Sequence, residues 1–180
     1  MFRGTPLTPE TDYTLTGDTT VTEPGYYTLI LTGAGEFIDE VTAGYTVYAC
    51  SGYRSYDTQS YIYWNHIDRY EAQGMTREEA DAATRLAVNY PGCSEHQLGL
   101  AMDLLEYPDQ PMEPAIGGSG LMLWLEEHCM DYGFIIRYPD GKTEITGVEY
   151  EPWHLRFVGT CARYIMTHDL CLEEFLSLYE

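Results

Sequence analysis

The segment Ser94–Asp103, Ser-Glu-His-Gln-Leu-Gly-Leu-Ala-Met-Asp, constrains the fold more than any other part of the chain. It holds His96 and Asp103, with two very small residues, Gly99 and Ala101, between them. Side chains alternate along a strand, so a strand over 99–103 would leave space beside the Asp103 carboxylate. A loop ending at His96 would then bring an imidazole to the same point, which suits a divalent metal ion. The intervening apolar residues are expected to face a core: Leu100, Met102 and Leu104.

A third ligand is offered by the segment Glu151-Pro-Trp-His154. His154 is the natural candidate, and Glu151 stands three residues before it. On a straight strand those two side chains would face opposite ways, so Pro152 is expected to hold Glu151 in a loop before a strand that starts near Trp153. Zinc suits two imidazoles and one carboxylate and keeps a fourth position for water. A free Glu151 carboxylate could then accept the proton of that water and return it to a leaving amine.

The charge of the chain excludes two classes of partner. There are 29 acidic residues against 9 Lys and Arg, a formal net charge of −20. Nucleic acids and anionic membrane surfaces both require a basic patch, so neither is expected as a partner. No apolar run is long enough to span a bilayer, and the first residues contain no apolar signal core. The expectation is a protein without stable membrane insertion, with any leader or anchor absent from this chain.

Five cysteines are present, and none forms a Cys-x-x-Cys pair, so a thiolate zinc finger is not expected. An odd count leaves at least one free thiol, and one or two disulfides are open if the protein is exported. Cys93 is expected to be a small buried residue. The cysteines are Cys50, Cys93, Cys129, Cys161 and Cys171.

The rest of the chain predicts an α+β protein, with helices packed on a small antiparallel sheet. Residues 1–46 are predicted to form a β-rich N-terminal segment, and residues 47–180 the main domain. Helices are predicted at 58–72, 76–88, 120–132, 160–168 and 172–179. Strands are predicted at 26–32, 45–50, 99–103, 134–138, 143–150 and 153–158. Thr76-Arg-Glu-Glu79 is a capping box.

The pattern Ser-x-His-x-x-Gly-x-Ala-x-Asp, followed by Glu-x-Trp-His, resembles the VanY-type D-alanyl-D-alanine carboxypeptidases. These are zinc peptidases that share a hedgehog-like core with the D,D-dipeptidases. The resemblance covers about residues 47–178 and departs from the family pattern at Gly33–Thr46, which is broken by glycines. Further motifs stand in family order: Ser51-Gly-Tyr-Arg-Ser55 with Gln59, Pro91–Gln97, Tyr132–Pro139, and Gly141-Lys142 through Ile145-Thr-Gly147.

The resemblance implies a role for each matching position. Zinc would be bound by His96, Asp103 and His154, with Glu151 as the general base. Arg54 would contact the substrate and the oxyanion, because a guanidinium binds a carboxylate or stabilises tetrahedral charge. Gln59 and Ser94 match substrate-contacting positions. Two further residues are left open between substrate contact and ion pair: Arg137 and Arg156.

The function predicted from this resemblance is a zinc carboxypeptidase that removes the C-terminal D-alanine from peptidoglycan stem peptides. The protein is expected to be a monomer and extracytoplasmic, where that substrate lies. A close alternative is an L,D-carboxypeptidase acting on tetrapeptide stems, and endopeptidase or dipeptidase activity is also open. A non-catalytic zinc-containing module that binds the cell wall is a rival of another class. A cysteine hydrolase using Cys93 and His96 is a third reading.

Overall fold

The computed structural model describes residues 13–17, 25–33 and 40–179. These residues fall into two compact units, each described here by itself. One unit reaches Tyr48 and includes Leu105–Pro108, and the other holds Ala49–Leu104 and the chain from Asp109 onward. No helix among the described residues has the length and apolar character needed to cross a bilayer.

The first unit contains a three-stranded antiparallel arrangement. Strand β1 (Tyr13–Gly17) pairs with β2 (Gly25–Gly33), and β2 pairs with β3 (Glu40–Ser51). The strands predicted at 26–32 and 45–50 lie within β2 and β3 and are confirmed. The rest of the β-rich segment predicted for residues 1–46 lies outside the described residues, and the domain division after residue 46 stays a prediction.

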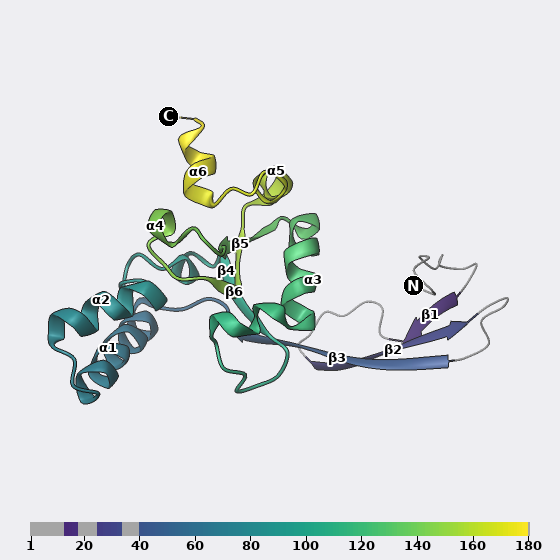
Figure 1. Ribbon diagram of the computed structural model, residues 1–180, viewed down its shortest axis with the longest axis horizontal. Coiled ribbons are helices and arrows are strands. Elements are labelled where there is room, and N and C mark those ends of the chain that lie inside the picture. Colours follow the sequence, from purple (N-terminus) through teal and green to yellow (C-terminus); the bar gives the residue numbers. More distant parts are fainter. Residues whose placement is uncertain (1–12, 18–24, 34–39, 180) are drawn as a thin grey trace. The chain divides into compact units, whose positions relative to one another are not determined.

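The sheet of the second unit has the strand order β3-β4-β6-β5, with the C-terminal end of β3 at one side (Figure 1). Strand β6 (Glu151–Phe157) is antiparallel to both β4 (Ala101–Leu105) and β5 (Phe134–Tyr138). In the β4–β6 ladder, Asp103 lies directly opposite His154. Two residues of the predicted metal site are therefore cross-strand partners.

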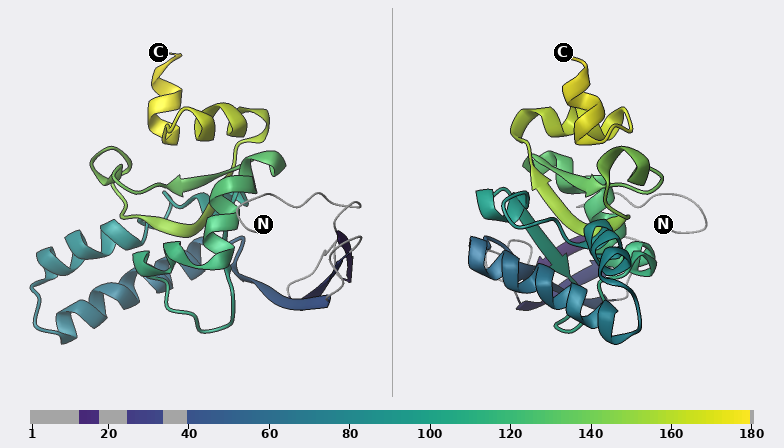
Figure 2. Two further views of the ribbon diagram at one scale, coloured as in Figure 1. Left: turned by 45° about the vertical axis from the view of Figure 1, so that its right-hand side comes forward. Right: turned by 90° about the vertical axis from the view of Figure 1, so that its left-hand side faces the viewer.

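Helices α1 (Tyr56–Ala72) and α2 (Arg77–Ala87) form an antiparallel pair, seen side by side in Figure 2. The predicted capping box is present: the Thr76 hydroxyl accepts from the Glu79 N–H, and the Glu79 carboxylate accepts from the Thr76 N–H. The pair is held together by buried apolar side chains from both helices and the residue after them: Tyr63, Ile67, Ala80 and Val88.

The other helices pack on β5 and β6. Helix α3 (Gly120–His128) contacts both strands, and α5 (Ala162–Thr167) contacts β5. Helix α6 (Leu172–Ser177) adds Phe175 to a core that also contains residues of β5 and α5: Ile135, Ala162 and Ile165. Short 3-10 turns occur at Glu95–Leu98, Pro114–Gly118, Cys129–Tyr132 and Gly159–Cys161. The predicted α+β class, a small antiparallel sheet carrying helices, is confirmed.

Several local predictions were wrong. The strand predicted over 143–150 is absent from this described part of the chain. A single helical turn, α4 (Thr143–Thr146), ends there at Gly147, whose φ of 73° a strand residue does not adopt. Gly99 is also not in a strand, because its φ of 68° closes the 3-10 turn before β4. The expectation that Leu100, Met102 and Leu104 face a core was also wrong, because all three are only partly buried. The buried residues of β4 are Ala101, Asp103 and Leu105, and histidine and arginine side chains pair with the Asp103 carboxylate.

Candidate metal centre

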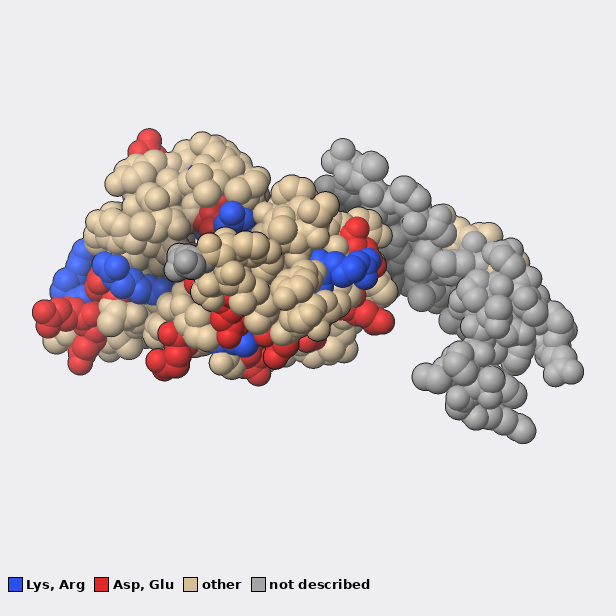
Figure 3. Space-filling model, turned by 90° about the horizontal axis from the view of Figure 1, so that it is seen from above, with Lys and Arg blue, Asp and Glu red and all other residues tan. Residues whose placement is uncertain are grey.

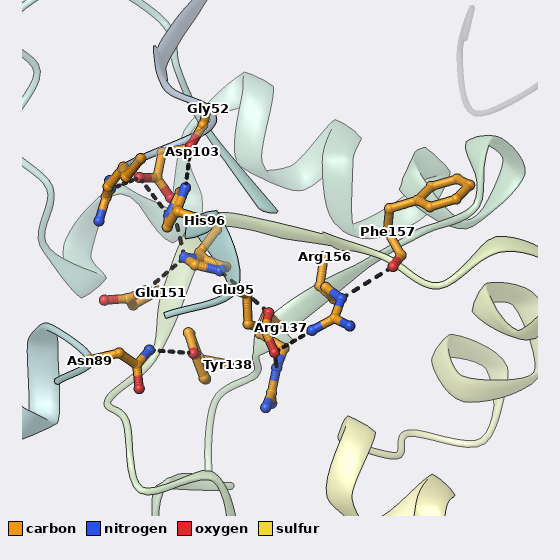
Figure 4. Close-up of polar contacts among 12 residues, drawn as sticks. Gly52, Asn89, Glu95, His96, Asp103, Arg137, Tyr138, Glu151, Arg156 and Phe157 are labelled. Atoms are coloured by element: carbon orange, nitrogen blue, oxygen red, sulfur yellow. Dashed lines mark hydrogen bonds and ion pairs between the residues drawn. The ribbon is translucent and has the colours of Figure 1, made fainter. Parts of the chain in front are cut away.

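Three side chains from three separate elements meet in the second unit. His96 comes from the 3-10 turn Glu95–Leu98, Asp103 from β4 and His154 from β6. One ligand atom of each lies within 4.8 Å of the others, and all three residues are buried. Figure 4 shows His96 and Asp103 next to each other, with Glu151 close by. The structure thus brings together the three residues that the sequence predicted as metal ligands.

Backbone geometry accounts for this convergence. The β4–β6 register places Asp103 opposite His154, and the turn that carries His96 leads directly into β4. Gly99 ends that turn in the left-handed backbone conformation, which residues with a side chain rarely adopt. Gly99 therefore serves the shape of the backbone rather than clearing space beside Asp103, since a Cβ at this position would meet no atom within 4 Å.

The donor atoms fit a divalent cation. His96 Nδ1 donates to the Gly52 carbonyl oxygen at 2.8 Å, which leaves the Nε2 lone pair 3.3 Å from Asp103 Oδ2. Nδ1 of His154 lies 3.2 Å from Asp103 Oδ1, and that oxygen is buried without a hydrogen-bond partner among the described residues. Two imidazole nitrogens and an unpaired carboxylate oxygen facing one another are the donor set of a mononuclear zinc site.

The electrostatics of the centre favour a bound positive charge. Burial alone would raise the pKa of Asp103, but contacts with His154 and His96 hold that pKa well below its usual value. Burial opposes a charge on His154 too, yet the carboxylates of Asp103, Glu151 and Glu95 raise its pKa to about 10. A site that draws protons this strongly is an anionic pocket in which a divalent cation can replace the proton.

Glu151 lies beside the three ligands without being one of them. Its Oε2 is 3.4 Å from His154 Nδ1, and burial raises its pKa above the usual glutamate value. The strand begins at Glu151, so the prediction of a loop there was wrong. The two side chains still converge, because the β5–β6 register shifts between Ile136 and Tyr138 and β6 takes up extra residues around Pro152.

Arg54 connects the metal centre to the adjoining pocket. Its Nη2 contacts Asp103 Oδ2 at 2.7 Å, its Nε donates to the Ser51 hydroxyl at 2.7 Å, and its Nη1 donates to Gln59 Oε1 at 3.4 Å. Gln59 is fully buried and is itself held by a 2.7 Å bond to the Asn89 carbonyl oxygen. The guanidinium is therefore fixed on several sides at the mouth of the site.

A pocket of about 210 Å³ adjoins the cluster. Its wall includes every site residue predicted from the sequence: Arg54, Gln59, Ser94, His96, Asp103, Glu151 and His154. The volume suits the end of a short peptide better than a large ligand. The substrate-contacting roles of Arg54, Gln59 and Ser94 remain predictions.

The two arginines that the sequence left open form ion pairs. Arg137 Nε lies 2.7 Å and Arg156 Nη1 2.6 Å from the same oxygen of Glu95 (Figure 4). Sequence reasoning assigned no role to Glu95. The available signal was its position, an acidic residue directly before a metal-ligand histidine, but the arginines that surround it are distant in the chain.

The cysteine-hydrolase reading has no geometric support. Both ring nitrogens of His96 already face Gly52 and Asp103, and Cys93 is exposed, so the prediction that it is buried was wrong. All five cysteines are free thiols.

A mononuclear His₂–Asp centre with a neighbouring free carboxylate, carried by a small α+β fold, defines the class of metal-dependent hydrolase sites. The family model described as VanY, D-alanyl-D-alanine carboxypeptidase, matches residues 34–160. The chain belongs to this family.

Individual relatives agree with the family assignment. A D-alanyl-D-alanine carboxypeptidase of Enterococcus faecalis is 44% identical over 128 residues, which cover 71% of this chain and 46% of the relative. A variant of the vancomycin-resistance D,D-pentapeptidase VanY in complex with Zn(II) superposes with a TM-score of 0.64 at 42% identity, covering 73% of this chain and 72% of that one. The LD-carboxypeptidase LdcB gives 0.62 at 42% identity, covering 74% and 59%. The chain spans between about a third and about half of the length of the curated relatives it matches.

Proposed function

We propose that this chain is a zinc-dependent carboxypeptidase that removes the C-terminal D-alanine from peptidoglycan stem peptides. The observation that carries the proposal is the buried His96–Asp103–His154 cluster with the Glu151 carboxylate 3.4 Å from one of its ligands. The names of the relatives support the substrate class, and the Zn(II) complex of one relative supports the metal.

The proposed division of roles follows from the contacts. Bound zinc would supply a Lewis acid that polarises the scissile carbonyl and acidifies a water molecule. Glu151 takes the proton of that water and later delivers it to the leaving amine. Arg54 stabilises negative charge on the substrate, either its terminal carboxylate or the developing oxyanion. Gln59 orients Arg54, and Ser94 contacts the substrate from the pocket wall.

The same proposal implies a partner and a compartment. Peptidoglycan stem peptides lie outside the cytoplasmic membrane, so we infer an extracytoplasmic enzyme that acts as a monomer. On the face shown in Figure 3, the Lys and Arg side chains of the described residues form separate groups between acidic residues rather than one continuous basic surface. This distribution and the net charge of −20 both disfavour electrostatic binding of the protein to nucleic acid or to anionic polymers.

An L,D-carboxypeptidase acting on tetrapeptide stems is the second candidate, and the likeness to LdcB favours it. The metal centre would be the same for both activities. The test is mass spectrometry of purified tripeptide, tetrapeptide and pentapeptide muropeptides after incubation with the protein, with and without chelator. Chelator-sensitive loss of one alanine from the pentapeptide supports the first function, and loss from the tetrapeptide alone supports the second. No loss from either stem contradicts both.

Replacing Glu151 by Ala separates an enzyme from a module that only binds the cell wall. An enzyme should keep zinc, because Glu151 is not among the three ligands, and should lose about 10²–10⁴-fold in turnover with its general base. Zinc content is measured by atomic absorption and turnover by alanine release. Glu149→Ala, an exposed glutamate nearby, is the control and should stay close to wild type. Equal turnover in both variants would rule out Glu151 as the base.

A further inference from the structure

Glu95 is a buried carboxylate whose two oxygens are in different situations. Its side chain is 11% exposed, and its Oε1 contacts both Arg137 and Arg156, at 2.7 and 2.6 Å. Its Oε2 is buried, and no hydrogen-bond partner for it occurs among the described residues. The arginines therefore occupy one oxygen and leave the other free to accept.

The free oxygen faces a free donor. His154 Nε2 is likewise buried without a hydrogen-bond partner in the described part of the chain, and it lies 3.8 Å from Glu95 Oε2. This nitrogen is on the far side of the ring from Nδ1, which faces Asp103 and Glu151. A buried donor and a buried acceptor left unpaired each cost free energy, so a hydrogen bond between them, formed by a small movement of the His154 ring, would be favourable.

The other histidine ligand shows the same arrangement completed. His96 Nδ1 donates to the Gly52 carbonyl oxygen, so its Nε2 carries the lone pair toward the centre. The two rings must therefore present opposite nitrogens to one metal ion, and each needs its own acceptor to fix that choice. Gly52 supplies the acceptor for His96, and only Glu95 approaches the outer nitrogen of His154 among the ion pairs of the described residues.

We propose that Glu95 is a positioning residue for the metal centre: it accepts the Nε2–H of His154 and so holds Nδ1 as the metal-binding nitrogen. This inference rests on the proposed zinc-dependent function. An outer carboxylate on a ligand histidine fixes the ring orientation and raises its basicity, and its loss typically costs 10–100-fold in metal affinity.

The arginines make this carboxylate rigid. Arg137 is held from the other side by Glu173 of α6, with 2.6 Å between Nη2 and Oε1. Two arginines and two glutamates leave the group formally neutral, so Glu95 can stay ionised in a buried position without an excess of charge. Successive contacts thereby connect helix α6 to the metal centre, from Glu173 to Arg137 and from Arg137 to Glu95.

The test compares a charge-balanced double variant with a single variant as its control. Glu95→Met alone leaves an excess positive charge, so the variant of interest is the double variant Glu95→Met/Arg156→Gln, which removes one charge of each sign and leaves no acceptor at position 95 for the His154 Nε2–H. Arg156→Gln alone is the matched control, because it keeps the Glu95–His154 contact. Zinc dissociation constants are measured by competition with a chromophoric chelator, and folding is checked by circular dichroism.

We expect Arg156→Gln to bind zinc within about threefold of wild type, and the double variant to bind about 10–100-fold more weakly. Equal affinity in the two variants would overturn the role of Glu95. Wild-type protein that binds no zinc would instead overturn the proposed function, so the two failures are distinguishable.

A second measurement needs no variant that might misfold. In zinc-loaded wild-type protein, ¹⁵N-labelled at histidine, His154 should show a downfield Nε2–H proton protected from exchange with solvent. The same proton should exchange faster in the double variant and stay protected in Arg156→Gln. A rapidly exchanging Nε2–H in the wild type would overturn the inference even if no variant folds.

Discussion

Asp103 uses its two carboxylate oxygens for different purposes. Oδ2 is 2.7 Å from Arg54 Nη2, whereas Oδ1 has no hydrogen-bond partner within the described chain and faces His154 Nδ1. Because Arg54 neutralises one oxygen, the other can bind a metal while the residue stays buried. The same guanidinium also lines the pocket, so it connects the candidate metal ligands to the cavity wall.

The first prediction concerns the planar guanidinium of Arg54, a fork whose three nitrogens contact three different residues. Arg54→Lys keeps the charge but loses the simultaneous contacts with Asp103, Ser51 and Gln59. We expect kcat/KM to fall about 10–100-fold, the equivalent of one charged hydrogen bond of about 1.5–3 kcal/mol. Steady-state kinetics of alanine release measure it, with the exposed Arg69→Lys as control. Unchanged kinetics in the Arg54→Lys variant would contradict a role for the fork.

At this scale the sequence predicted which residues would lie together at the centre, because they belong to short motifs. His96, Asp103, His154 and Glu151 all lie in two short segments whose chemistry is legible without a structure. The role of Glu95 was not predictable, because it depends on an arginine 42 residues away and on the direction in which the His154 ring turns. Such facts arise from tertiary packing and leave no local pattern.

Among the elements, the two N-caps of α2 and α3 make a matched comparison. The Thr76 hydroxyl accepts from the Glu79 N–H, whereas Ser119 makes no side-chain cap hydrogen bond, and its hydroxyl is buried without a partner among the described residues. We expect Thr76→Ala to lower the free energy of unfolding by about 1 kcal/mol, and Ser119→Ala to leave it nearly unchanged. Urea denaturation followed by circular dichroism measures both. Equal losses would show that the cap bond of Thr76 contributes nothing specific.

Helix α6 supplies a pH-dependent element. The Cys171 N–H and then Lys142 lower the pKa of the Glu174 carboxyl below its ordinary value. A depressed carboxyl pKa stabilises the fold above the unfolded pKa, and that contribution is lost as the pH falls through the folded pKa. We therefore expect Glu174→Gln to reduce stability at pH 7 and to flatten its decline below about pH 4.5. Urea titrations across pH 3–7 measure this, with Glu144→Gln as an exposed control. Parallel wild-type and variant curves would contradict the assignment.

Predictions of whole elements succeeded where periodicity and caps agreed. The α1–α2 pair, β5 and the two C-terminal helices follow from apolar spacing and from turn residues. The strand predicted over 143–150 was wrong although its Thr, Ile and Val residues favour a strand. Gly147 adopts a positive φ, and the backbone N–H of Glu149 donates to the Leu86 carbonyl oxygen in α2. A contact between distant segments outweighed local preference there.

For the whole molecule, the ligands come from three elements that only the folded chain brings together. A metal that binds the folded state alone stabilises it by about 2.7 kcal/mol when its concentration is 100 times the dissociation constant. For a domain of this size that corresponds to an increase in melting temperature of about 5–10 °C. Differential scanning fluorimetry with zinc and with chelator measures the shift. His154→Ala should abolish it and His128→Ala should retain it, and a shift that survives His154→Ala would place the metal elsewhere.

The pairing of Asp103 with His154 across β4 and β6 has a consequence for how such proteins diversify. Hydrogen bonding between adjacent strands fixes the separation of directly opposed residues, so the β4–β6 pairing sets the distance between these two ligands. Insertions in the connecting loops can change the walls of the cavity without changing that distance. Selectivity for one peptide terminus over another can therefore drift during evolution while the catalytic chemistry stays constant.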